Sequence, residues 1–272
     1  MMKEIIDYKY LDKGKDKLNN MRHSHSDGYE ILLIRAGSGS VIVRDRLFAM
    51  QSGAIWFING MDTHCTVPEN PDEYYRGKII IKSSFIDAVA KTVGAEEIVG
   101  DLFHKNGGTY ILPDEETEKY INGEFSKICR ALMDNSVYTK GMVAVGIMNI
   151  LYAGHSKREE QPLTTDSRVS RMLDYINKNL SQSISLDDIC AHVHVSRYYL
   201  CHMFKKTVGM TVFEYILSRR LSIARRYLLD TDMTLSQIAS SVGFSSFSYF
   251  SKAFREYEGM TPSKFRSDNK SE

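Results

Sequence analysis

The chain lacks several features that would place a protein in a specialised class. Its 272 residues contain no run of about 18 apolar residues, so we expect no membrane-spanning helix. Only four cysteines are present, without a CxxC pair, which favours a reducing cytosol over a disulfide framework. The first residues are charged and lack the apolar stretch of a signal peptide, so we expect a cytoplasmic protein. No P-loop, GxGxxG or Ser-His-Asp pattern stands out, and we therefore expect neither an enzyme nor an organic cofactor.

Net charge is also small, but its distribution is uneven. The formal net charge is +1. From residue 166 onward the chain has 15 Lys and Arg against 11 Asp and Glu, whereas the preceding part has 20 against 23. A basic segment joined to a mildly acidic one suits a nucleic-acid-binding domain attached to a separate sensing domain. The excess is modest, so this pattern only supports other observations.

Short β-type segments dominate the chain up to residue 82. Apolar runs occupy positions 29–36, 39–45, 54–59 and 75–83, and Gly, Asn, Asp and Pro separate them. Several short strands at this spacing predict a small antiparallel barrel or sandwich. We assign residues 1–82 to it.

Helical periodicity follows between residues 83 and 155, a region that we assign to dimerisation or packing. Its last helix is strongly apolar along one stripe, formed by Val143, Ile147, Ile150 and Leu151. Such a stripe packs either within the subunit or on a second copy, and the sequence leaves both open. Residues 156–166 are charged, contain a proline and show no apolar period, so we expect an interdomain linker there.

The remaining segment, residues 167–272, reads as helices and repeats one pattern. Residues 185–208 and 234–257 each combine a short amphipathic helix, a tight turn and a second helix with exposed polar residues. This pattern predicts a helix-turn-helix, and two in tandem predict a domain that binds double-stranded DNA. We expect helix N-caps at Ser185, Ser196, Thr211, Thr234, Ser245 and Thr261.

Helical angles divide each second helix into a buried and an exposed face. We expect buried stripes at Leu200, Met203, Phe204 and Val208 in the first copy and at Phe247, Phe250 and Phe254 in the second. The opposite, polar faces can enter the major groove. The candidate DNA-binding residues are Ser196, Arg197, Tyr198, Cys201, His202, Lys205, Ser245, Ser246, Tyr249 and Lys252. We expect the first copy to carry most of the sequence discrimination, because Glu256 of the second would repel phosphate.

A long helix is expected between the two copies. Residues 211–230 predict about five turns, roughly 30 Å at 1.5 Å per residue. One DNA turn is about 34 Å, so such a connector can set two recognition helices into successive major grooves. Four arginines on it can bind phosphate or form internal ion pairs, namely Arg219, Arg220, Arg225 and Arg226.

These hundred residues resemble the DNA-binding domain of AraC/XylS-type transcription regulators. The matching positions are Ala191, Ser196, Leu200, Phe204, Lys205, Gly209, Tyr215, Arg219, Ala224, Leu228, Ile238, Ala239, Gly243, Phe244, Ser248, Tyr249, Phe250, Phe254, Gly259, Met260, Thr261, Pro262, Phe265 and Arg266. Most of these positions are structural, so the resemblance implies the fold more firmly than any base contact. It also implies promoter DNA and RNA polymerase as partners, a homodimer, and mostly activation.

The N-terminal region resembles the two cupin motifs. His23, His25, Glu30 and Gly37 fit the first motif, and Gly53 and His64 fit the second, whereas Asn59, Met61 and Pro68 depart from it. AraC-type regulators commonly carry a cupin-like barrel as effector domain. The resemblance therefore implies an α+β chain, with a cupin-like antiparallel barrel and following helices, then an all-α domain of two helix-turn-helix units joined by a long helix. The implied effector is a small molecule, with sugars as the commonest class, and the candidate contacts are His23, His25, Glu30, Trp56 and His64.

Metal binding is a less favoured reading of the same residues. In metal-binding cupins the positions of His23, His25, Glu30 and His64 are the ligands, but we favour effector contact, and a structural role stays open. A second cluster superficially resembles a zinc site and consists of Cys190, His192, His194, Cys201 and His202. Its members fall on opposed helix faces, so we expect no metal there.

Three hypotheses remain. The favoured one is a DNA-binding transcription regulator controlled by an effector in the barrel. The alternatives are a metal-dependent cupin enzyme with a DNA-binding tail and a ligand-independent dimeric regulator.

Overall fold

A computed structural model describes residues 2–13, 28–44, 46–60, 62–104, 109–157 and 168–269 of the chain. The chain consists of two compact units, Met1–Thr164 and Thr165–Glu272, and each is described by itself. Two of the candidate effector residues, His23 and His25, lie outside the described residues, as does most of the expected linker. Across the described ranges, none of the helices has both the length and the apolar character needed to span a membrane.

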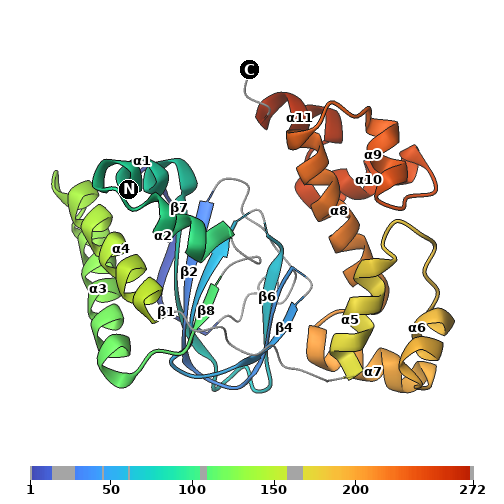
Figure 1. The fold of residues 1–272 in the computed structure, drawn as a ribbon, viewed down its shortest axis with the longest axis horizontal. Coiled ribbons are helices and arrows are strands. Elements are labelled where there is room, and N and C mark those ends of the chain that lie inside the picture. The colour runs from blue at the N-terminus through green and yellow to red at the C-terminus, as the bar shows by residue number, and fades with distance from the viewer. Residues whose placement is uncertain are drawn as a thin grey trace. The chain divides into compact units, whose positions relative to one another are not determined.

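The strands of the N-terminal unit form two antiparallel sheets (Figure 1). The larger sheet has the order β1 (Ile5–Asp12), β7 (Tyr75–Lys82), β2 (Gly28–Ala36), β5 (Ile55–Asn59) and β8 (Thr109–Ile111). The smaller sheet has the order β4 (Arg46–Met50), β3 (Gly39–Val43) and β6 (His64–Pro68). Apolar side chains of both sheets share one buried cluster, so the sheets face each other. The prediction of an antiparallel sheet unit is confirmed, but the described strands form two separate sheets rather than a closed barrel.

Two strands of the larger sheet differ from the prediction. β1 is rich in charged residues and was not expected as a strand, yet it pairs antiparallel with β7. β8 comes from the region expected to be helical and pairs with β5, where Trp56 lies opposite Tyr110. Both strands lie at the edges of the sheet. Polar or charged side chains are common on edge strands, so these strands lack the apolar alternation that the sequence analysis relied on.

Strand alternation gives the larger sheet two different faces. On β2, Tyr29, Ile31 and Leu33 belong to the core shared with the helices. Their neighbours Leu32 and Ile34 belong instead to the cluster shared with the smaller sheet. Polar side chains on the same face of the sheet as Leu32 and Ile34 therefore point between the two sheets.

The helices of this unit pack on one face of the larger sheet. They are α1 (Ser83–Val93), α2 (Glu96–Val99), the π-helical turn η2 (Gly100–His104), α3 (Glu115–Asp134) and α4 (Thr139–Ser156). The apolar stripe of α4 expected at Val143, Ile147, Ile150 and Leu151 is buried within the unit. Gly154 allows α4 to approach the sheet closely, since a Cβ there would lie 2.4 Å from the Phe57 ring. The stripe thus packs within the subunit, and a different face of α4 is exposed.

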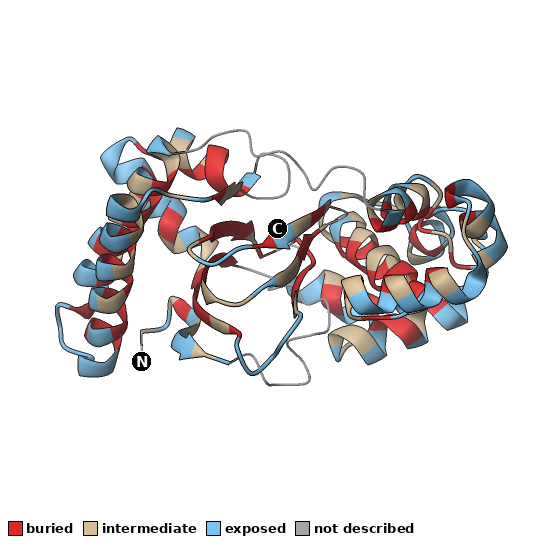
Figure 2. Cartoon of the chain, turned by 90° about the horizontal axis from the view of Figure 1, so that it is seen from below, coloured by how far each residue is buried: buried red, intermediate tan, exposed pale blue. Residues whose placement is uncertain are grey.

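The C-terminal unit is helical throughout its described residues. Its helices are α5 (Arg168–Lys178), α6 (Leu186–Val193), α7 (Arg197–Val208), α8 (Val212–Asp230), α9 (Leu235–Ser241), α10 (Phe247–Glu258) and α11 (Pro262–Asn269). Buried residues line the inward sides of these helices, and exposed residues line the outer sides (Figure 2). Side-chain N-caps occur at Ser185, Ser196, Thr211 and Thr234 as expected, and Thr261 accepts a hydrogen bond from the amide of Lys264. The cap of α10 is Ser246 rather than Ser245, because the Ser246 hydroxyl accepts the Tyr249 amide.

Candidate nucleic-acid interface and interior polar network

The first helix pair, α6 and α7, presents one side of α7 to solvent. His194 adopts left-handed backbone geometry with φ of 55° and ends α6. Leu200, Phe204 and Val208 are fully buried and anchor α7, as the helical angles predict. Met203, expected in the same stripe, is only half-buried. The buried stripe therefore fixes which side of α7 is free to meet another molecule.

The exposed side of α7 gathers most of the candidate DNA-binding residues of the first copy. Tyr198 is 81% exposed, and Cys201, His202 and Lys205 are exposed as well. These four residues and Lys206 line a surface hollow of about 460 Å³. The rings of Tyr198 and His202 are stacked, with centroids 6.1 Å apart and an interplanar angle of 13°. This face thus combines two stacked rings with cationic side chains.

Two other candidates of the first copy already have partners within the protein. The Ser196 hydroxyl accepts the Tyr199 amide as an N-cap. Arg197 donates from both Nε and Nη2 to the carboxylate of Asp187 on α6, and this hydrogen bonding holds the pKa of Asp187 below its ordinary value. Both side chains of the pair are 64% exposed, so the pair stabilises the fold little. A phosphate contact by Arg197 would have to replace it.

The second helix pair, α9 and α10, presents a less basic face. Ser245, Ser246, Tyr249 and Lys252 are all exposed. Lys252 lies 3.9 Å from Glu256 one turn away, which partly neutralises its charge. The prediction that Phe247 is buried is wrong, because this residue begins α10 and is 42% exposed. The buried stripe consists of Phe250, Ala253 and Phe254.

Helix α8 joins the two pairs, and three of its four arginines are used internally. Arg219 donates to the Asn177 amide oxygen at 3.0 Å, and Arg220 donates to two backbone carbonyls of the loop between α5 and α6. Arg225 is 2% exposed and lies 3.5 Å from Glu258. Arg226 is exposed. Arg225 thus forms one of the internal ion pairs expected as an alternative, whereas Arg219 and Arg220 donate hydrogen bonds to an amide oxygen and to backbone carbonyls.

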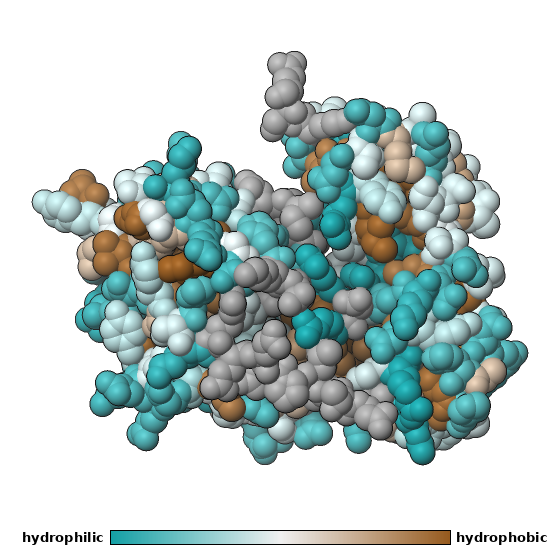
Figure 3. Space-filling model, viewed as in Figure 1, coloured by the Kyte–Doolittle hydropathy of each residue, from teal (hydrophilic) through white to brown (hydrophobic). Residues whose placement is uncertain are grey.

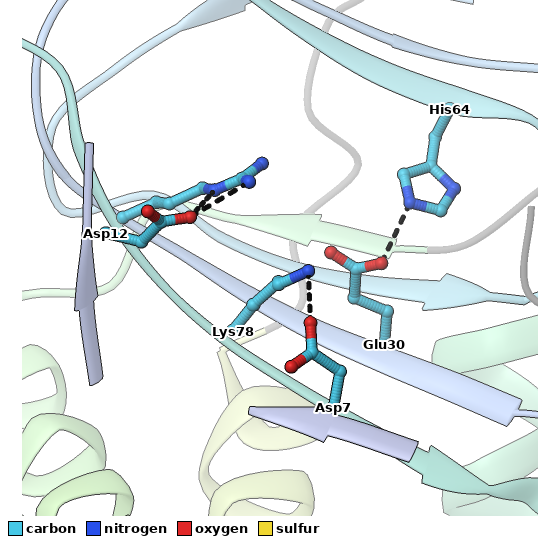
Figure 4. Close-up of polar contacts among 6 residues, drawn as sticks. Asp7, Asp12, Glu30, His64 and Lys78 are labelled. Atoms are coloured by element: carbon cyan, nitrogen blue, oxygen red, sulfur yellow. Dashed lines mark hydrogen bonds and ion pairs between the residues drawn. The ribbon is translucent and has the colours of Figure 1, made fainter. Parts of the chain in front are cut away.

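A buried ion pair lies between the two sheets of the N-terminal unit. His64 Nε2 lies 2.9 Å from Glu30 Oε2 (Figure 4). The other ring nitrogen, Nδ1, lies 2.9 Å from the Asp62 carbonyl oxygen. A carbonyl and a carboxylate both accept hydrogen bonds, so this geometry suits an imidazolium that donates from both nitrogens. Burial lowers the pKa of His64, but the charge of Glu30 and its hydrogen bond outweigh burial and raise it.

Two further ion pairs beside it were missed by the sequence reasoning. Arg76 Nη2 lies 3.1 Å from Asp12 Oδ2, and Lys78 Nζ lies 2.6 Å from Asp7 Oδ2 (Figure 4). Both cations are on β7 and both anions are on the edge strand β1. The sequence did contain a sign of these buried cations, namely the alternation along β7. Arg76 and Lys78 share one face of this strand, and Ile79 and Ile81 lie on the other.

Trp56 lies in the same interior and is 2% exposed. Its ring packs against Phe48 and Tyr110, each with centroids 4.7 Å away. Within the described part of the chain, its buried Nε1 has no hydrogen-bond partner. Buried indole N–H groups usually have one, so this atom offers a donor to an acceptor in the interior.

Two possible metal clusters can be compared with the geometry. Of the cupin-type set, only Glu30 and His64 are described, and they bond to each other directly. Over the ranges that the structure describes, no group of three or more His, Cys, Asp or Glu side chains is placed to hold a metal ion. Those ranges include the cluster around Cys190 and Cys201.

Comparison with known proteins places these features in a family. A family model for a helix-turn-helix domain matches residues 189–268. The HTH-type transcriptional activator AarP of Providencia stuartii is 36% identical over 118 residues, which are 43% of this chain and 86% of AarP. The chain belongs to the AraC/XylS family of transcription regulators.

Other relatives extend the AraC/XylS match in different ways. The Msm operon regulatory protein of Streptococcus mutans is 25% identical over 250 residues, 89% of this chain and 85% of that protein. The melibiose operon regulatory protein of Escherichia coli K12 is 35% identical over 98 residues, 36% of this chain and 32% of that protein. The chain spans less than half the length of three of the curated relatives it matches.

Several positions that match the family have clear structural roles in this protein. Gly209 and Gly259 end α7 and α10 with φ of 78° and 74°, a left-handed geometry that favours glycine. Leu200 and Phe254 are buried. Ala191 differs, because it is exposed, whereas its neighbour Cys190 is half-buried.

Proposed function

We propose that this AraC/XylS-type chain activates transcription by binding specific promoter DNA through α7 and α10, under the control of a small molecule bound between the sheets of the N-terminal unit. The observation that carries the proposal is the exposed face of α7. A rigid helix with stacked rings and cations on one side, anchored by a buried stripe on the other, is what a major-groove reader requires.

The roles of individual side chains follow from their chemistry. His202 and Tyr198 offer ring N–H and O–H groups to base edges, and Lys205 offers a point charge to phosphate. On α10, Tyr249 and the Glu256-paired Lys252 offer less positive charge. We therefore assign most of the sequence discrimination to α7 and mainly positioning to α10.

Paired variants test this assignment. His202→Ala should weaken binding to a selected operator by about 1–3 kcal/mol, because a base contact is lost. Lys252→Ala should have a smaller effect, because Glu256 already offsets its charge. Titration of labelled operator measures both affinities, and thermal melting should show both variants folded. Larger losses from Lys252→Ala than from His202→Ala would contradict the assignment.

The effector proposal rests on the interior between the sheets. Its buried charged groups include Glu30, His64, Arg76 and Lys78. Glu30 pairs with His64, and the two β7 cations pair with Asp12 and Asp7, which are less buried on the edge strand. Such pairing gives little net charge but many donors and acceptors, which suits a neutral polar ligand such as a sugar. An aromatic ring with a buried N–H, as at Trp56, adds a stacking surface for a sugar face.

Intrinsic fluorescence can test the effector proposal directly. Trp56 is the only tryptophan in the chain, so its emission reports on this interior alone. Titration with a panel of sugars and other metabolites should give a saturable change with one class of ligand and raise the melting temperature. A ligand that raises the melting temperature without altering Trp56 emission would place the effector elsewhere.

We also propose a homodimer formed through the exposed side of α3 and α4. Apolar residues collect there, and Figure 3 shows hydrophobic surface over the side of the unit that carries these helices. Val137, Tyr138, Met142 and Val145 are exposed and border a groove of about 580 Å³. A patch with both protruding side chains and a hollow can pack on its own copy about a twofold axis. Sedimentation should show a dimer for the native chain and a monomer for Met142→Glu.

The alternative hypotheses have separate tests. A metal-dependent enzyme requires bound metal, so less than about a tenth of an equivalent in protein purified without added metal contradicts it. A ligand-independent regulator predicts no stabilisation by any ligand of the panel. RNA polymerase as a partner predicts that the protein raises transcription from a promoter containing the selected operator.

A further inference from the structure

We propose that Cys190 and Cys201 form a redox-sensitive dithiol between α6 and α7, which a hydroperoxide oxidises to a disulfide that weakens DNA binding. The effect on DNA rests on the function proposed above. The formation of the disulfide does not, because it concerns the helix pair alone.

A contact that joins the two helices lies one helical turn from each thiol. Arg197, at the start of α7, reaches across to Asp187, in the first turn of α6. Cys190 follows Asp187 by three residues, and Cys201 follows Arg197 by four. Residues three or four apart lie on the same side of a helix. Each cysteine is therefore one turn along from a residue that already bridges the two helices.

Cys190 lies in the last turn of α6, just before the turn between the helices. The Cys190 carbonyl accepts the amide N–H groups of His194 and Val195, so it closes the end of α6, and the chain leaves the helix at His194. Because only His194, Val195 and Ser196 separate the helices, α7 starts close to the end of α6 that carries Cys190.

The electrostatic surroundings agree with this placement. Burial raises the pKa of Cys190, and the negative charges of Asp187 and Cys201 raise it further, whereas Arg197 lowers it. The pKa of Arg197 is raised mainly by its hydrogen bond with Asp187, with smaller contributions from both thiols. Both thiols are thus close enough to Arg197 to influence its pKa.

Exposure divides the roles of the two thiols. Cys201 is exposed on the face that includes His202 and Lys205, so it is open to a soluble oxidant. Cys190 is half-buried, and we assign it to resolve the first product. The other two cysteines, Cys65 and Cys129, are buried in the N-terminal unit and should react more slowly.

The chemistry balances with a hydroperoxide as the two-electron oxidant. The Cys201 thiolate attacks the outer peroxide oxygen, so an S–O bond forms, the O–O bond breaks and an alcohol or water leaves. Cys190 then attacks the sulfenic sulfur of Cys201, so an S–S bond forms and the S–O bond breaks. The departing hydroxide takes up the proton of Cys190 and leaves as water. Both sulfurs are oxidised and the peroxide is reduced.

The disulfide would change the face that meets DNA. A disulfide requires Cα atoms about 4.4–6.8 Å apart and a fixed torsion, so Cys201 must turn toward α6. Cys201 lies beside His202 and one turn from Lys205 on α7, and its rotation displaces the groups proposed to read bases. In a reducing compartment such a bond is transient and reversible by thiols.

The test treats the full-length protein with an equivalent of hydrogen peroxide. Non-reducing peptide mapping should show one linked peptide pair joining Cys190 to Cys201, with loss of two hydrogen atoms. Affinity for the selected operator should fall roughly tenfold or more and return with dithiothreitol. Cys190→Ser should retain its operator affinity and form no link, whereas Cys129→Ser should respond like the native chain.

Different failures can be told apart. Absence of the linked peptide, or an equal loss of DNA binding by oxidised Cys190→Ser, would overturn the dithiol. A link that leaves operator affinity unchanged would overturn the effect on DNA. If the reduced protein shows no preference for any DNA sequence, the proposed function fails, and the linked peptide still decides the dithiol.

Discussion

Phe254→Ala should lower the free energy of unfolding of the C-terminal unit by about 3–5 kcal/mol, the usual cost of removing a buried aromatic ring. Phe254 is fully buried, and its ring contacts those of Phe250 and Phe265 at centroid distances of 5.7 and 5.5 Å. These contacts hold α10 on α11, so the loss should also disturb the exposed face of α10. Chemical denaturation of the full chain, followed by helical circular dichroism, measures the change.

Phe247 provides the matched control on the same helix. Its side chain is 42% exposed, so Phe247→Ala should cost about 1 kcal/mol or less. Trp56 emission reports only on the N-terminal unit and should change less than the helical signal in either variant. Equal destabilisation by the two substitutions would mean that the buried stripe of α10 is misassigned.

His64→Ala should destabilise the N-terminal unit by about 3–5 kcal/mol, because it removes the hydrogen-bonded counter-charge of a buried carboxylate. Glu30 is 1% exposed and His64 is 2% exposed. The double variant Glu30→Leu/His64→Ala should recover part of the loss, since apolar groups in place of both partners leave no buried charge. Denaturation followed by Trp56 emission measures all three proteins. A double variant as unstable as His64→Ala would contradict the ion pair.

The same variant should show a defined pH dependence. The folded-state pKa of His64 is raised, so its protonation adds stability that is fully present below the ordinary value of 6.5. That stability is lost as the pH rises through the raised folded-state pKa. The difference in stability between the native chain and His64→Ala should therefore shrink as the pH rises above 6.5 and through the raised folded-state pKa.

The sequence predicted the helical part of the molecule better than the sheet part. The buried residues Leu200, Phe204 and Phe254 follow from helical angles, because each helix packs one side on its neighbours. Caps such as Ser185 and Thr234 follow from the local chemistry of helix ends. These features depend on nearby residues, which is why a single sequence reveals them.

The interior of the sheet unit depends on distant residues and was only partly predictable. Glu30 and His64 were singled out by motif spacing, but their direct bond joins residues 34 positions apart. Arg76 and Lys78 were missed because their partners are on β1, a charged edge strand without an apolar alternation. The same difficulty hid β8, a three-residue strand that needs β5 beside it. Phe247 was misplaced because helical angles do not show where packing ends along a helix.

Selection of bound sequences from random DNA, followed by competition between the enriched site and random DNA at fixed salt, tests the central claim most directly. The account predicts an enriched site with two elements about one helical turn apart, bound roughly a thousandfold or more tighter than random DNA. His202→Ala should relax the preference at one element, and Lys252→Ala should leave the preferred sequence unchanged. Binding without sequence preference, or a preference that neither α7 nor α10 variants alter, would contradict the account.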